Sequence, residues 1–154
     1  MQEFSKTCAF FGHRDTPESA SYKLQQWVEI MITQLQVRDF LVGNNGSFDA
    51  MAARTVRSWQ KTHSQIGLHL VLAYLPDPGS NLTSLTQTGF DSLLFPEGLE
   101  TVPKRFAICH RNRWMARQAD YLITYVNHSY GGAYQALTYA NRLDSCYTIN
   151  LPNV

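Results

Sequence analysis

The chain of 154 residues has the length of one domain, and its 44% hydrophobic and 12% aromatic content is typical of a packed globular protein, which excludes a disordered chain. Its 13 basic and 12 acidic residues give a formal net charge of +1. That charge provides no global field for a polyanion, so the sequence predicts that nucleic acid is not the main partner.

The first half of the chain predicts strands that alternate with helices. Short apolar runs predict the strands, and apolar residues at helical spacing predict the helices. The strands are expected at Thr7–Phe11, Asp39–Val42 and Leu68–Leu75, and the helices at about Pro17–Gln36 and Phe48–Ser64. Ser47 is placed as the N-cap of the second helix.

The second half continues the same alternation after Pro76–Gly89, a segment rich in Pro, Gly, Ser and Thr that predicts a loop. The length of this loop indicates a lid, a partner contact or local disorder. Further strands are expected at Phe90–Phe95, Tyr121–Val126 and Cys146–Leu151, and helices at about Lys104–Gln118 and Ala133–Leu143. The alternation predicts a single α/β domain over residues 1–154, a three-layer sandwich with a mainly parallel sheet.

Glycines follow three of the predicted strands, at Gly12, Gly43 and Gly131-Gly132. In a parallel sheet these strand ends lie at one edge, where ligands of such folds bind. His13 and Arg14 follow the first glycine and precede a helix-start signal, so Arg14 is a candidate phosphate contact. The alternative is that the glycines serve tight turns between strand and helix and bind nothing.

Charged residues near this edge have competing interpretations. The helix at Lys104–Gln118 contains no acidic residue, and Arg111 is the arginine best placed to reach the sheet edge, although a solvated face explains it equally well. Asp49 could hold a ribose hydroxyl, act as a base, or stabilise the first turn of a helix. His13 is either a ligand donor, a general acid or a structural histidine.

Nothing in the sequence predicts a metal or a cofactor. The three cysteines, Cys8, Cys109 and Cys146, lack metal-ligand spacing and indicate reduced thiols in a cytoplasmic protein. No apolar run approaches the ~20 residues that span a bilayer, so no membrane partner is expected. The eight tyrosines and three tryptophans exceed the needs of one core and favour a homo-oligomer.

Five segments, in chain order, resemble the SLOG superfamily, and within it the small bacterial proteins of the YpsA type: CAFFGHR (8–14), GNNGSFD (43–49), FDSLLFPE (90–97), HRNRWMARQADYLITYV (110–126) and GGAYQALTYA (131–140). The resemblance implies a Rossmann-like fold that binds nucleotide-derived ligands, including ADP-ribose-like molecules. It implies the following ligand-binding residues: Gly12, His13, Arg14, Gly43, Asn44, Gly46, Ser47, Asp49, Arg111, Asn112, Gly131, Gly132 and Ala133.

The resemblance does not extend to catalysis. Related phosphoribohydrolases carry the loop P-G-G-x-G-T-x-x-E, whereas this chain has Tyr130-Gly131-Gly132-Ala133-Tyr134-Gln135-Ala136-Leu137-Thr138 and lacks the proline, the third glycine, the threonine and the glutamate. We therefore assign no catalytic residue.

Three functions follow from these residues, in order of preference. The first is binding or sensing of a phosphate-containing nucleotide derivative. The second is cleavage of an N-glycosidic bond, with Asp49 or another acid taking part. The third, by resemblance to the DNA processing protein A family, is single-stranded DNA binding, against which the net charge argues.

Overall fold

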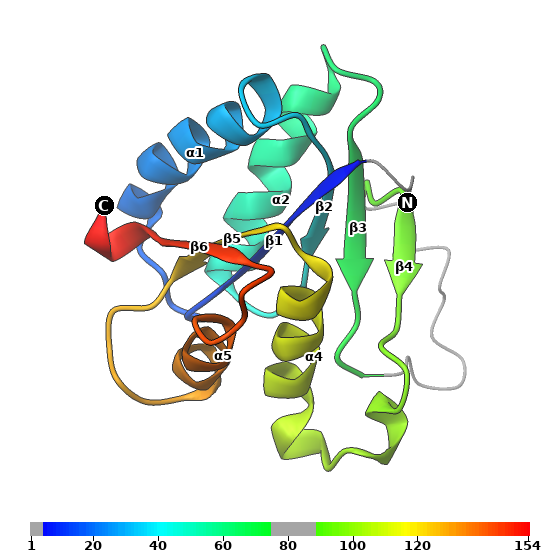
Figure 1. The fold of residues 1–154 in the computed structure, drawn as a ribbon, viewed down its shortest axis with the longest axis vertical. Helices are drawn as coiled ribbons and strands as arrows, with labels where there is room; N and C mark the ends of the chain where they lie inside the picture. The colour runs from blue at the N-terminus through cyan, green and yellow to red at the C-terminus, as the bar shows by residue number, and fades with distance from the viewer. Residues whose placement is uncertain (1–4, 75–88) are drawn as a thin grey trace.

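The computed structural model describes residues 5–74 and 89–154. Six strands form one sheet: β1 (Lys6–Gly12), β2 (Val37–Val42), β3 (Gly67–Val71), β4 (Ser92–Leu94), β5 (Tyr121–Tyr125) and β6 (Tyr147–Asn150). Their order is β4-β3-β2-β1-β5-β6, and every neighbouring pair is parallel (Figure 1). This confirms the predicted α/β class with a Rossmann-like sheet. The loop predicted at Pro76–Gly89 lies outside the described residues, except for Gly89.

Helices cover both faces of the sheet, as a three-layer sandwich requires. They are α1 (Ser21–Thr33), α2 (Ser47–Gln60), α4 (Lys104–Gln118) and α5 (Gly132–Ala140), together with 3-10 turns at Glu18–Ala20, Leu99–Thr101 and Leu151–Asn153. α1 packs against α2, and α4 lies beside α5 (Figure 1). Parallel strands joined by such crossovers need a helical cover on each face.

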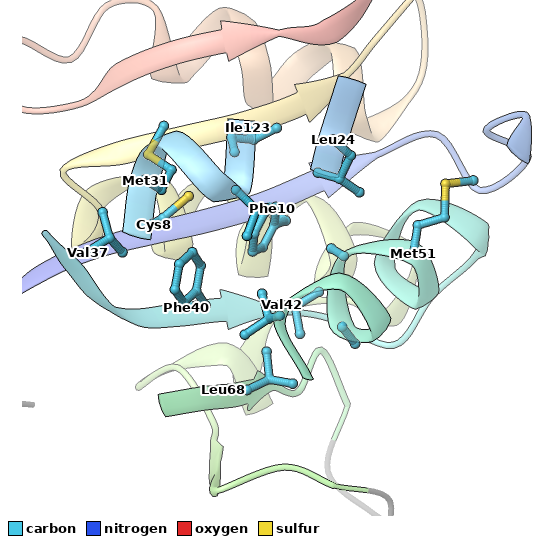
Figure 2. Close-up of a cluster of buried hydrophobic side chains, with 14 of the residues drawn as sticks. Cys8, Phe10, Leu24, Met31, Val37, Phe40, Val42, Met51, Leu68 and Ile123 are labelled. Atoms are coloured by element: carbon cyan, nitrogen blue, oxygen red, sulfur yellow. The ribbon is translucent and has the colours of Figure 1, made fainter. Parts of the chain in front are cut away.

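Alternation along β1 divides the core between the two faces. Cys8 and Phe10 join the cluster under α1 and α2, while Ala9 and Phe11 join the cluster under α4 and α5. Figure 2 shows the first cluster, where Phe10 stacks on Phe40 at a centroid distance of 5.8 Å. Because β1 is buried on both faces, it reads in the sequence as a continuous apolar run.

Several predicted boundaries were wrong. The helices expected to end at about Gln36, Ser64 and Leu143 end at Thr33, Gln60 and Ala140. The helix expected from Pro17 begins as a 3-10 turn and becomes α-helical only at Ser21, and the strand expected to reach Leu75 ends at Val71. Ser47 is not the N-cap of α2, because Gly46 holds that position with φ of 124°. The Ser47 hydroxyl instead contacts the carbonyls of Arg14 and Thr16, at 3.0 and 2.8 Å.

Candidate functional site

The chain path leaves a crevice beside β1. From β1 the chain runs outward through β2, β3 and β4 on one side and then returns to build β5 and β6 on the other. The loops after β1 and β5 therefore leave the sheet in different directions, and ligands of open α/β sheets bind at this switch point. A cleft of about 430 Å³ lies there, lined by Gly12, His13, Arg14, Asn45, Arg105, Phe106, Ile108, Cys109, Asn112, Gly131, Gly132, Ala133 and Gln135.

Most of the sequence-predicted site residues lie around this cleft or a neighbouring one. The first cleft holds Gly12, His13, Arg14, Asn112, Gly131, Gly132 and Ala133. A second cleft of about 390 Å³ is lined by the predicted Gly43, Asn44, Gly46 and Asp49, and by Ala50, Ala53, Arg54, Arg57 and Phe90. These predicted residues fall into two groups, and the predicted Ser47 and Arg111 line neither of the two clefts.

The loop after β1 is held by both neighbouring segments. The His13 N–H donates to the Tyr125 carbonyl at 3.1 Å, which continues the pairing with β5. The Arg14 carbonyl accepts from the Ser47 N–H at 2.8 Å, which joins the loop to the start of α2. Ser47 therefore positions the backbone of Arg14 instead of capping its own helix.

The N-terminus of α5 provides backbone donors to the cleft. Gly131 stands at the N-cap with φ of 90°, a conformation that glycine adopts without strain, and no described side chain caps this end. The first helical bond runs from the Gln135 N–H to the Gly131 carbonyl, so the N–H groups of Gly132, Ala133 and Tyr134 have no partner within the helix. Such groups, together with the helix dipole, favour an anion.

Two arginines flank this helix end. Arg14 follows β1, Arg105 lies in the first turn of α4, and both side chains are exposed. The described residues that line the cleft include no aspartate or glutamate. The local charge of the cleft is therefore positive even though the whole chain carries a formal charge of only +1.

Arg111 supports the loop at 43–46 from beneath and does not point into solvent. Its side chain is 1% exposed, and Nη1 donates to Asn45 Oδ1 at 2.7 Å and to the Val71 carbonyl at 3.3 Å. Nε donates to Asn112 Oδ1 at 3.2 Å. The direct ligand contact expected of Arg111 thus requires the guanidinium to leave these partners, and its observed role is to position Asn45, which lines the cleft.

Asp49 is buried beside this arginine. Its Oδ2 accepts the Asn45 N–H at 2.9 Å. Burial raises the pKa of Asp49, and the Arg111 charge and this hydrogen bond lower it by less. Burial also lowers the pKa of Arg111, against the opposing effect of Asp49. Asp49 thus helps to shape the loop, and it lines the second cleft.

His13 is a hydrogen-bonded histidine that also faces the main cleft. Its Nε2 accepts the Asn127 N–H at 3.1 Å, so in the neutral ring the proton is on Nδ1. The ring stacks on His128 with centroids 3.5 Å apart, and His128 stacks on Tyr130 at 3.9 Å. Burial lowers the pKa of His13, as does His128, whereas Asp15 raises it.

Sequence reasoning missed four residues that shape this edge, namely Arg105, Phe106, His128 and Tyr130. Arg105 lies over the Phe106 ring at 4.8 Å from the centroid. The available signal was position, because Arg105 and Phe106 open α4 at the carboxyl edge and the other two residues follow β5 directly. The stacking itself has no counterpart in periodicity.

Fold and site together define the class: a Rossmann-like α/β domain with an anion-favouring cleft at its switch point. No family model matches the chain, and no curated protein matches it in sequence. Its structure is similar to DNA processing protein A from Streptococcus pneumoniae, with a TM-score of 0.64 and 15% identity over 89% of this chain and 47% of that one. This chain therefore spans about half the length of that protein.

A second solved structure shares the fold. DNA processing protein A from Helicobacter pylori matches with a TM-score of 0.65 and 11% identity over 96% of this chain and 70% of that one, and it is described by its single-stranded DNA binding mode. At these identities the likeness shows the fold alone, so the resemblance to the SLOG superfamily stays a prediction. The narrower resemblance to the YpsA type stays a prediction.

The expectation that nucleic acid is an unlikely partner was wrong. It rested on net charge, and a protein with this fold is described as binding single-stranded DNA. Charge summed over a chain does not describe the field at one edge of a sheet.

The expectation of no membrane partner rested on the lack of a long apolar run in the sequence. Within residues 5–74 and 89–154, no helix is long and apolar enough to cross a bilayer.

Proposed function

We propose that the cleft between the ends of β1 and β5 binds a phosphate-containing nucleotide derivative, of the mononucleotide or ADP-ribose class. One observation carries this proposal: the unpaired N–H groups of the α5 N-terminus, Arg14 and Arg105 meet in a cleft whose described lining has no carboxylate. A phosphate is the biological group that such a set of donors binds best.

The size of the cleft supports a small ligand. Its volume of about 430 Å³ lies in the range that small-molecule sites occupy. Asn112 adds an amide to the lining, but its Oδ1 already accepts from Arg111, so it offers its Nδ2 donors. The polar groups that remain free at the cleft are therefore mainly donors, which again favours an anion.

Calorimetry with AMP, ADP-ribose and adenosine tests the proposal, because AMP and ADP-ribose carry phosphate groups whereas adenosine has the same base without a phosphate. We expect AMP or ADP-ribose to bind, and Arg14→Gln or Arg105→Gln to weaken binding by about tenfold each, through loss of a charge-assisted contact. Arg142→Gln, an exposed arginine beyond α5, is the matched control. Equal binding of adenosine and AMP, or no heat with any ligand, would refute the phosphate site.

A second candidate is single-stranded DNA binding, which the fold likeness to the H. pylori protein favours. An independent observation supports it: cations and aromatic rings pair along the first turn of α4, where Lys104 lies 5.3 Å from the Tyr74 ring and Arg105 lies over Phe106. Phe106 is 47% exposed, and rings beside cations serve as stacking platforms in proteins that bind single strands.

Salt dependence distinguishes the two candidates. Anisotropy of a labelled dT oligomer would show log K falling with log [NaCl] at a slope of about −2 if three phosphates are contacted, since each contributes about −0.7 in single strands. A free nucleotide held by one phosphate group gives a shallower slope. Tight binding of the oligomer with no binding of AMP or ADP-ribose would favour the strand as the ligand.

A further inference from the structure

Three rings stack in a column between the loop after β1, which contains His13, and the loop after β5, which contains His128 and Tyr130. His13 lies at its inner end, His128 in the middle and Tyr130 at its outer end, with interplanar angles of 11° and 20°. His13 lines the cleft, and Tyr130 is 70% exposed. The column therefore leads from the cleft to solvent.

Backbone hydrogen bonds fix the two imidazoles. His13 Nε2 accepts the Asn127 N–H, and His128 Nδ1 donates to the Tyr130 carbonyl at 3.1 Å. Because both imidazole rings are held, the Tyr130 ring, which stacks on His128, has a supported orientation although it is exposed. A ring supported in this way loses little conformational freedom when a ligand stacks on it.

We infer that the outer face of Tyr130 is the stacking platform for the nucleobase of the ligand, as a fourth ring on the His13–His128–Tyr130 column. The inference rests on the proposed function. Tyr130 directly precedes Gly131 and Gly132, where the phosphate is proposed to bind. A nucleotide carries its base one pentose away from its phosphate, so both groups meet adjacent residues of one loop.

Stacking accepts any base, because every base has a π-face. The platform thus recognises a planar nucleobase without reading its edge, and it serves a free nucleotide and a nucleotide within a single strand alike. The two sources share this chemistry, and the experiment below contains an arm for each.

Quenching of 2-aminopurine fluorescence tests the inference, since stacking on an aromatic ring quenches this base. The probes are 2-aminopurine deoxyriboside 5′-monophosphate and a short dT oligomer with one central 2-aminopurine. Ribose 5-phosphate, which has no base, reports on the phosphate site alone. Tyr130→Ala removes the platform and Tyr130→Phe keeps the ring. Tyr22→Ala is the matched control, because Tyr22 in α1 is also 70% exposed.

We expect wild type, Tyr130→Phe and Tyr22→Ala to quench whichever probe is the ligand. Tyr130→Ala should bind that probe about tenfold more weakly and without quenching, as expected for the loss of one base–aromatic contact. Its affinity for ribose 5-phosphate should match that of wild type. That last result separates a lost platform from a damaged fold.

The outcomes separate the inference from the proposed function. If Tyr130→Ala still quenches the probe as wild type does, the platform is refuted, while phosphate binding by ribose 5-phosphate leaves the proposed function standing. If neither probe nor ribose 5-phosphate binds wild type, both fail. Quenching of the oligomer alone assigns the platform to a strand, and quenching of the monophosphate alone assigns it to a free nucleotide.

Discussion

Gly43→Ala is expected to destabilise the protein by displacing a buried charge. A Cβ at Gly43 would lie 2.4 Å from Arg111 Nη1 and 2.6 Å from Cζ, closer than atoms approach without overlap. The end of a long side chain normally moves aside at low cost. This one is 1% exposed and bound to Asn45, Val71 and Asn112, so moving it breaks those hydrogen bonds.

The magnitude follows from the bonds that must break. Nη1 alone makes two of them, and hydrogen bonds from a charged donor contribute about 1.5–3 kcal/mol each. Loss of both, with partial recovery as the loop relaxes, costs about 3 kcal/mol in the free energy of unfolding. For a chain of 154 residues that is a fall in Tm of about 6–12 °C.

Urea unfolding of a double-mutant cycle with Arg111→Met checks the reasoning. Methionine keeps most of the stem and removes the guanidinium, so Gly43→Ala should cost less than about 1 kcal/mol in that background. Gly98→Ala is the control for backbone strain alone. Gly98 has φ of 82° with nothing within 4 Å of an added Cβ, and it should cost about 1–2 kcal/mol in either background. An equal cost of Gly43→Ala with and without Arg111 would refute this account.

Three further predictions concern single residues. The pKa of His13 in the fold is lowered from its ordinary value of 6.5, so the unfolded chain binds the proton more readily. The stability that neutral His13 contributes is therefore fully present above pH 6.5 and is lost as the pH falls below it. His13→Gln should flatten this pH dependence in thermal melts. Ser47→Ala should cost about 1 kcal/mol in urea unfolding and weaken phosphate binding through Arg14, whose carbonyl it contacts. Asn150→Leu should cost about 3 kcal/mol in urea unfolding, because its amide bonds both the N–H and the carbonyl of Val126 at the end of β5.

The sheet and its ligand edge could be predicted because each depends on local pattern. Apolar runs located β1 and β5, the helix predicted at Lys104–Gln118 has the observed bounds of α4, and parallel connections then place the glycine loops at one edge. The surroundings of the charged Arg111 side chain could not be predicted in the same way. Helical spacing gives the face on which Arg111 lies, but not that the loop at 43–46 closes over it.

Competition between partners explains the other differences. Ser47 matches the N-cap pattern, but in the fold the carbonyls of Arg14 and Thr16 lie within reach of its hydroxyl. The stacking of His128 and Tyr130 depends on where β1 places His13, more than a hundred residues away in the sequence. No window of sequence contains such contacts, so only the fold reveals them.

The distribution of carboxylates explains why the net charge led to a wrong prediction about nucleic acid as a partner. Several acidic side chains are engaged away from the main cleft: Glu18 pairs with Arg54 at 2.7 Å, Asp91 accepts the Leu68 N–H, and Asp120 accepts a backbone N–H of β1. Fields of exposed charges decay over about 8–10 Å at physiological salt, so a ligand at the cleft responds chiefly to the charges nearby. Arg14 and Arg105 line the cleft and no carboxylate stands in its described lining, so an anionic nucleotide or strand is attracted there whatever the sum over the chain.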